Sequence, residues 1–175
     1  MQQTQFQLIR VIRKIRLFRG LGVESIKKLL PFCRLVSYKE GENIYEIGDI
    51  SREMLILLKG RLEVSDQSGE ILATIQPGSS VGEMGVFTGE PRSANVIARG
   101  EISGLIIGKN DLQKLMTIDT DINNKILHNL VAVLSERLVQ ANRLNNRHTE
   151  TIAKMDDQLV RHTGLNSGEL EERGL

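Results

Sequence analysis

Glycines at close intervals interrupt the apolar runs between residues 35 and 109, and they limit the folds this chain can adopt. The runs are short and rich in branched side chains, as at residues 54–58 and 71–75. Between them lie turn-forming residues, among them Gly41, Gly48, Gly60, Gly69, Gly78, Gly82, Gly89 and Gly104. Short apolar runs separated by turns are typical of a β-sandwich or β-barrel. The sequence therefore predicts an all-β segment from residue 35 to residue 109.

Helical spacing precedes this segment. Apolar residues alternate with arginine and lysine over residues 6–18, which predicts an amphipathic helix. A second, shorter helix is predicted over residues 23–30, ending at Pro31, because proline cannot continue a helix. The basic residues of the first helix are Arg10, Arg13, Lys14, Arg16 and Arg19. Such a cluster would suit an anionic membrane or an acidic partner, but we expect a solvated helix face and no membrane binding.

A second helical segment follows the β segment. Asn110 and Asp111 can cap a helix, and no glycine or proline follows before Gly164. We therefore predict one long helix over residues 110–161 and a flexible, polar tail over residues 162–175.

Apolar side chains along this helix repeat with the 3-4 spacing of a coiled coil. One seam contains Leu127, Leu134, Ala141, His148 and Met155, and the other Val131, Leu138, Asn145, Ile152 and Leu159. Asn145 and His148 are polar interruptions that weaken the second half. The pattern predicts a parallel homodimer, and packing of the helix on its own barrel is the alternative.

Composition restricts the class of protein further. The 175 residues suffice for one domain with an appended segment. The chain has 23 basic and 22 acidic residues, so its overall charge does not favour binding to nucleic acid. Cys33 is the only cysteine, which excludes an internal disulfide and suits a reducing compartment. The apolar runs are shorter than the roughly 20 residues of a membrane span, and the first residues are polar. We expect a cytoplasmic protein without a signal peptide.

Residues 82–94 contain a carboxylate, Glu83, and a guanidinium, Arg92, nine positions apart around a glycine-rich turn. A planar guanidinium matches two phosphate oxygens, and a carboxylate accepts a hydrogen bond from a sugar hydroxyl. The glycines allow backbone N–H groups to approach an anion closely. This combination predicts a site for a phosphorylated sugar, and a cyclic nucleotide supplies both groups.

Several linked motifs resemble the cyclic nucleotide-binding domain family over roughly residues 12–142. They lie at residues 17–21, 41–49, 60–64, 77–83 and 91–94. The resemblance implies an α+β fold in which an antiparallel β-roll, or jelly-roll barrel, is flanked by N-terminal helices and a long C-terminal helix. The corresponding divisions are N-terminal helices at 1–34, the nucleotide-binding roll at 35–109, the long helix at 110–161 and the tail at 162–175.

The resemblance also implies roles for individual residues. Glu83 and the N–H of Gly82 would bind the ribose 2′-hydroxyl, and Arg92 and Ser93 would bind the cyclic phosphate. In the family, the segment matching residues 82–94 is called the phosphate-binding cassette. Its other positions expected to contact the ligand are Met84, Gly85 and Ala94. The alternative is that Glu83 and Arg92 are solvated loop charges and the glycines only form turns.

Recognition of the base is expected on the long helix, at Arg137 and Asn142. Ala141 and Asn142 replace a threonine–serine pair that contacts adenine in the family, so Asn142 is either a purine contact or an exposed helix residue. A threonine after the cassette arginine is associated in the family with cyclic GMP, and here Ser93 provides the hydroxyl alone. We expect cyclic AMP as the ligand, with cyclic GMP as the second choice.

A metal-dependent cupin enzyme is the main competing class for a β-roll. Cupin chemistry requires histidines inside the barrel, whereas His128, His148 and His162 all follow it. The cassette also has no nucleophile beside a base, so we expect neither an enzyme nor a metal. No helix-turn-helix pattern follows the long helix, so DNA binding is not expected. The sequence favours a stand-alone cyclic nucleotide receptor acting on a protein partner. A ligand-free assembly module and a regulatory subunit of a separate enzyme or channel are the alternatives.

Overall fold

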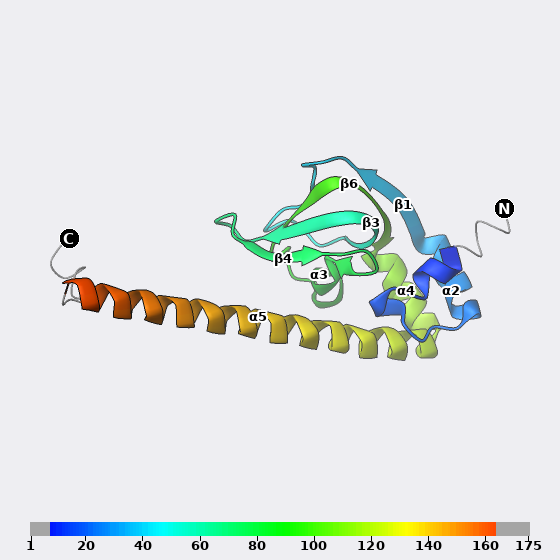
Figure 1. The fold of residues 1–175 in the computed structure, drawn as a ribbon. Coiled ribbons are helices and arrows are strands. Elements are labelled where there is room, and N and C mark those ends of the chain that lie inside the picture. The colour runs from blue at the N-terminus through cyan, green and yellow to red at the C-terminus, as the bar shows by residue number, and fades with distance from the viewer. Residues whose placement is uncertain (1–7, 164–175) are drawn as a thin grey trace. The chain divides into compact units, whose positions relative to one another are not determined.

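The computed structural model of this chain describes residues 8–163 and contains one antiparallel sheet, short helices beside it and a long helix (Figure 1). Contacts divide the chain into two compact units, which meet between Val133 and Leu134. The first unit contains the sheet, and the second contains the C-terminal part of the long helix. The predicted α+β class is confirmed.

The sheet has six strands, and two long ones form its centre. The strands are β1 (Cys33–Tyr38), β2 (Asn43–Tyr45), β3 (Glu53–Ser65), β4 (Ile71–Ile75), β5 (Ser80–Val81) and β6 (Asn95–Gly108). β3 pairs with β6 along most of its length; β1 and β2 pair with different parts of β6, and β4 and β5 with different parts of β3. Because each long strand has two successive partners, the sheet curls into the expected roll.

Glycine permits the close contacts that this curvature requires. The register of β3 against β6 shifts on both sides of Lys59, next to Gly60, which has φ +89°. A β-carbon at Gly60 would lie 2.6 Å from Cγ2 of Ile102, and one at Gly104 would lie 2.6 Å from Cδ1 of Leu55. Such irregularities bend a strand and increase its twist. The roll encloses an apolar core formed by Tyr45, Leu55, Leu57, Leu62, Ile75, Val81, Val96, Ala98, Ile102 and Ile106.

The N-terminal region contains a shorter helix than predicted. Residues 8–12 are helical, and the chain then turns before the 3-10 helix η1 (Arg16–Phe18). The prediction of one helix over residues 6–18 was therefore wrong in the described part. The N–H of Arg16 donates to the carbonyl of Gly78 at 3.2 Å, and Leu17 and Phe18 are both buried. Contact with the roll thus replaces the last helical turns.

The second N-terminal helix lies close to its predicted position. α2 spans Val23–Leu29, and the 3-10 helix η2 (Leu30–Phe32) continues the chain through Pro31 into β1. Cys33, at the start of β1, is half-buried, and its thiol donates to the carbonyl of Leu29 at 3.5 Å. Burial raises the pKa of this thiol to about 12, so the thiol stays protonated.

The region predicted as one long helix is divided at Asp119. α4 spans Lys109–Ile118, and α5 spans Thr120–Thr163. Asp119 is extended, and its carboxylate accepts a hydrogen bond from the N–H of Ile122 at 3.1 Å, as a helix-capping residue does. The capping role predicted for Asn110 and Asp111 was wrong, because α4 begins one residue earlier and its N-cap is Gly108.

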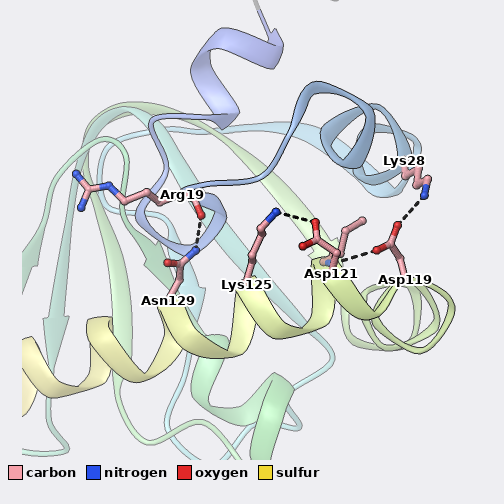
Figure 2. Close-up of polar contacts among 7 residues, drawn as sticks. Arg19, Lys28, Asp119, Asp121, Lys125 and Asn129 are labelled. Atoms are coloured by element: carbon pink, nitrogen blue, oxygen red, sulfur yellow. Dashed lines mark hydrogen bonds and ion pairs between the residues drawn. The ribbon is translucent and has the colours of Figure 1, made fainter.

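Polar contacts connect the start of α5 to the N-terminal region (Figure 2). Nζ of Lys28 on α2 donates to Asp119 at 2.6 Å, and this hydrogen bond lowers the pKa of the Asp119 carboxyl. Nδ2 of Asn129 donates to the carbonyls of Leu17 and Arg19 at 3.0 and 2.8 Å. The N-terminal segment and the first turns of α5 are therefore fastened to each other.

One face of α5 is buried within the first unit, at Ile122, Ile126, Leu130 and Val133. The predicted coiled-coil seam lies on a different face. Its exposed apolar members are Leu127, Val131, Leu138, Ile152 and Met155. Within the first unit, Leu127 and Val131 each follow a buried residue by one position, about 100° around the helix axis, and both stay exposed. Of the predicted tail, residues 162–163 end α5, and residues 164–175 lie outside the described part.

Candidate functional site

The phosphate-binding cassette predicted at residues 82–94 connects β5 to β6 and contains the short helix α3 (Glu83–Thr88). Gly82 is the N-cap of α3 with φ +78°, and Gly89 follows its last turn with φ +85°. Both angles are in the left-handed region that favours glycine. The two glycines therefore set where α3 begins and ends.

Gly82 and Gly85 also allow close packing. A β-carbon at Gly82 would lie 2.8 Å from Cε2 of Tyr45 and would overlap Nη1 of Arg92. A β-carbon at Gly85 would overlap Oγ of Ser51 and lie 2.7 Å from the carbonyl of Glu90. Both positions thus hold the backbone of the cassette against the roll, and a larger residue would displace it.

The Arg92 side chain points inward and is held by backbone carbonyls. Nη1 donates to the carbonyl of Gly82 at 3.0 Å, and Nη2 donates to that of Glu53 at 2.6 Å. Its main chain exchanges hydrogen bonds with the turn before β3: the N–H of Arg92 donates to Asp49 at 2.8 Å, and its carbonyl accepts from Gly48 at 2.9 Å. Both the backbone and the guanidinium of Arg92 therefore have defined positions.

Tyr45 forms the floor beneath this guanidinium. Cζ of Arg92 lies 3.5 Å from the centre of the Tyr45 ring, a cation–π contact. Burial raises the pKa of the Tyr45 phenol well above its usual range, so the phenol is neutral. Within residues 8–163, the Tyr45 hydroxyl and Oγ of Ser51 are buried without a hydrogen-bond partner. Sequence reasoning did not select Tyr45, although it lies in the motif at residues 41–49.

Asn95 is a second residue that sequence reasoning missed. It directly follows the cassette, and its side chain accepts from the N–H of Ile47 at 3.0 Å and donates to the carbonyl of Asp66 at 3.1 Å. These contacts join the end of the cassette to two turns of the roll. No local pattern identifies them, because both partners are distant in sequence.

The predicted cassette residues differ in exposure. Glu83 is fully buried and Arg92 is 7% exposed. Ser93 and Met84 are exposed, Ala94 and Gly82 are partly buried, and Gly85 is buried. The alternative that Glu83 and Arg92 are solvated loop charges was therefore wrong. Burying charged groups costs free energy unless other contacts compensate for it, so their positions point to a specific role.

The two residues predicted to read the base belong to the second unit. Arg137 is half-buried and Asn142 is exposed, both on α5. Their contact with a purine stays a prediction. Among the described residues, no group of three or more histidine, cysteine, aspartate or glutamate side chains is placed to hold a metal ion. None of the described helices is both long and apolar enough to span a membrane.

Residues 35–119 match the family model described as the cyclic nucleotide-binding domain. The match includes the roll from Leu35 onward and the cassette. Residues 35–119 therefore form a cyclic nucleotide-binding domain.

Known proteins are similar to parts of the chain. A cyclic nucleotide-gated channel of Caenorhabditis elegans is 33% identical over 108 residues, which cover 58% of the chain and 15% of the channel. The chain thus spans a small part of this relative's length.

Among solved structures, a cyclic nucleotide-binding domain from Methylobacillus flagellatus matches with a TM-score of 0.73 and 22% identity, covering 83% of this chain and 84% of that one. The regulatory domain of the Toxoplasma gondii kinase PKA, solved with cyclic AMP, matches with a TM-score of 0.66 and 19% identity, covering 77% of this chain and 51% of that one. At these identities, the likeness establishes the shared fold.

Proposed function

We propose that this chain is a receptor for cyclic AMP, with cyclic GMP as the second choice. The observation that carries the proposal is the burial of Glu83 and Arg92 at opposite ends of a cassette whose glycines permit close backbone approach. Arg92 would bind the cyclic phosphate together with Ser93, and Glu83 would accept the ribose 2′-hydroxyl. Gly82, Met84, Gly85 and Ala94 would complete the contact surface.

Occupancy of the cassette would act through α5 on a protein partner. The base would contact Arg137 and Asn142, and the ligand would favour the arrangement of α5 in which these contacts form. A ligand shifts such an equilibrium only by its differential affinity for the two arrangements. The exposed seam of α5 supports a parallel homodimer, and ligand binding would change the arrangement of its helices.

The chain would bind and release the nucleotide without chemical change, as a cytoplasmic protein that uses no metal and binds neither DNA nor membrane. Two alternatives concern the whole protein. The first is a regulatory subunit of a separate enzyme or channel. A ligand-free assembly module would use the roll and α5 only as structural parts.

Calorimetric titration of the purified chain with cyclic AMP, cyclic GMP and non-cyclic 5′-AMP tests the proposal. Because the chain has no Trp and only 2 Tyr, co-purified purine is first detected by its ultraviolet absorbance. We expect binding at micromolar concentration or tighter, with cyclic AMP preferred to cyclic GMP and 5′-AMP weakest. If neither cyclic nucleotide binds, the receptor proposal is wrong and the assembly module takes its place.

A further inference from the structure

Tyr45 occupies an unusual position for a core aromatic residue. It lies at the end of β2, is 7% exposed and packs with the roll core, yet the face of its ring lies against the guanidinium of Arg92. Arg92 is also 7% exposed. A cation has therefore been placed on an aromatic face away from water, where such a contact is stronger than at the surface.

The contacts of Arg92 define the orientation of its guanidinium. The carbonyls of Gly82 and Glu53 each accept from a different terminal nitrogen, and the Tyr45 ring supports one face of the plane. A guanidinium has five N–H donors, so these carbonyls take only part of its capacity. The remaining donors lie in a plane that the protein has already fixed.

We propose that Tyr45 is a positioning residue for ligand binding, whose ring holds the Arg92 guanidinium in the plane required by a phosphate group. This inference rests on the proposed function and adds a residue that the cassette motif does not contain. A free arginine side chain has many rotamers, and restricting them before binding reduces the entropy lost when the ligand binds. Tyr45 would thus raise affinity without touching the nucleotide.

Gly82 belongs to the same arrangement. A β-carbon there would reach both the Tyr45 ring and Nη1 of Arg92. The left-handed turn before α3, the aromatic ring and the guanidinium are therefore packed as one unit. A shift of the Tyr45 ring would therefore move the Arg92 guanidinium as well.

A double-mutant cycle on the full chain tests the proposal. Affinity for cyclic AMP is measured, by displacement of a fluorescent cyclic AMP analogue, for Tyr45→Phe and Tyr45→Leu, each with Arg92 intact and with Arg92→Ala. We expect Tyr45→Phe to keep the affinity, because it keeps the ring. Tyr45→Leu should weaken binding roughly three- to thirtyfold when Arg92 is present and by less than about twofold when it is absent.

Other results would overturn the proposal. An equal loss in both backgrounds would mean that Tyr45 acts only through the fold, and a loss with Tyr45→Phe would assign the role to the hydroxyl. If Tyr45→Leu does not fold, replacing Tyr45 with pentafluorophenylalanine keeps the ring shape but weakens its attraction for a cation, and unchanged affinity would contradict the proposal. If the wild-type chain binds neither nucleotide, the proposed function itself is wrong. If it binds, but the effect of Tyr45→Leu does not depend on Arg92, only the role of Tyr45 is wrong.

Discussion

At the scale of single residues, Gly82 carries two separate structural requirements. Its φ of +78° is unfavourable for other residues, and a β-carbon would also contact Tyr45 and Arg92. Gly41 has φ +79°, but a β-carbon there would contact nothing within 4 Å. This glycine therefore serves as a control for the backbone effect alone.

We expect Gly41→Ala to lower the free energy of unfolding by about 1–2 kcal/mol, the cost of the left-handed conformation. Gly82→Ala should cost about 1–3 kcal/mol more, because the side chain must also be accommodated. Denaturant unfolding of both variants measures the difference. Equal losses would show that the packing of Gly82 against Tyr45 and Arg92 adds nothing to stability.

Glu83 defines the ribose end of the proposed site. If its carboxylate accepts the 2′-hydroxyl, wild type should bind 2′-deoxy cyclic AMP about ten- to a hundredfold more weakly than cyclic AMP, since hydrogen bonds to charged groups contribute roughly 1.5–3 kcal/mol. Glu83→Gln keeps the shape and should reduce this discrimination. The ratio of the two dissociation constants is the measurement. A ratio that is the same in wild type and Glu83→Gln would exclude this role.

At the scale of elements, Asn129 joins α5 to the N-terminal segment. Its side chain makes two hydrogen bonds to backbone carbonyls there. Asn129→Ala should therefore lower the free energy of unfolding by about 1–2 kcal/mol. Asn124 is an exposed residue of the same helix. Asn124→Ala should change stability by less than about 0.5 kcal/mol. Indistinguishable urea midpoints for the two variants would contradict this account of the contact.

The sequence predicted the elements that local pattern determines. The apolar run at residues 71–75 is β4, and α2 follows its spacing closely. The break at Asp119 was missed because its signal is an ordinary capping aspartate without glycine or proline, and its second contact comes from Lys28, which is distant in sequence. The early end of the first helix has a similar cause, the hydrogen bond between Arg16 and Gly78.

The candidate site was likewise predictable only where the signal lies within one short segment of the sequence. Glu83 and Arg92 are recognisable because motif and chemistry coincide within one short segment. The Tyr45 ring and the Glu53 carbonyl come from other strands, and their contact with Arg92 exists only after the roll has formed. The positions of Arg137 and Asn142 on α5 do not test whether these residues contact the base. Recognition of the base therefore stays a prediction.

At the scale of the whole molecule, the exposed seam of α5 predicts the assembly. Leu138 lies on the seam and is 63% exposed, whereas Val139 is 48% exposed and lies about 100° away around the helix. We expect light scattering at micromolar concentration to give the mass of a dimer for wild type and Val139→Glu, and of a monomer for Leu138→Glu. A monomeric wild type, or a dimer that survives Leu138→Glu, would contradict the proposed interface.

The central claim is that Arg92 binds the phosphate of a cyclic nucleotide. Arg99, on β6, is a matched control because its guanidinium pairs with Glu63 at 2.6 Å outside the cassette. The most direct measurement is calorimetric titration of wild type, Arg92→Ala and Arg99→Ala with cyclic AMP. We predict that Arg92→Ala weakens binding about ten- to a hundredfold, or roughly 1.5–3 kcal/mol, and that Arg99→Ala does not. Unchanged affinity in Arg92→Ala would contradict the account.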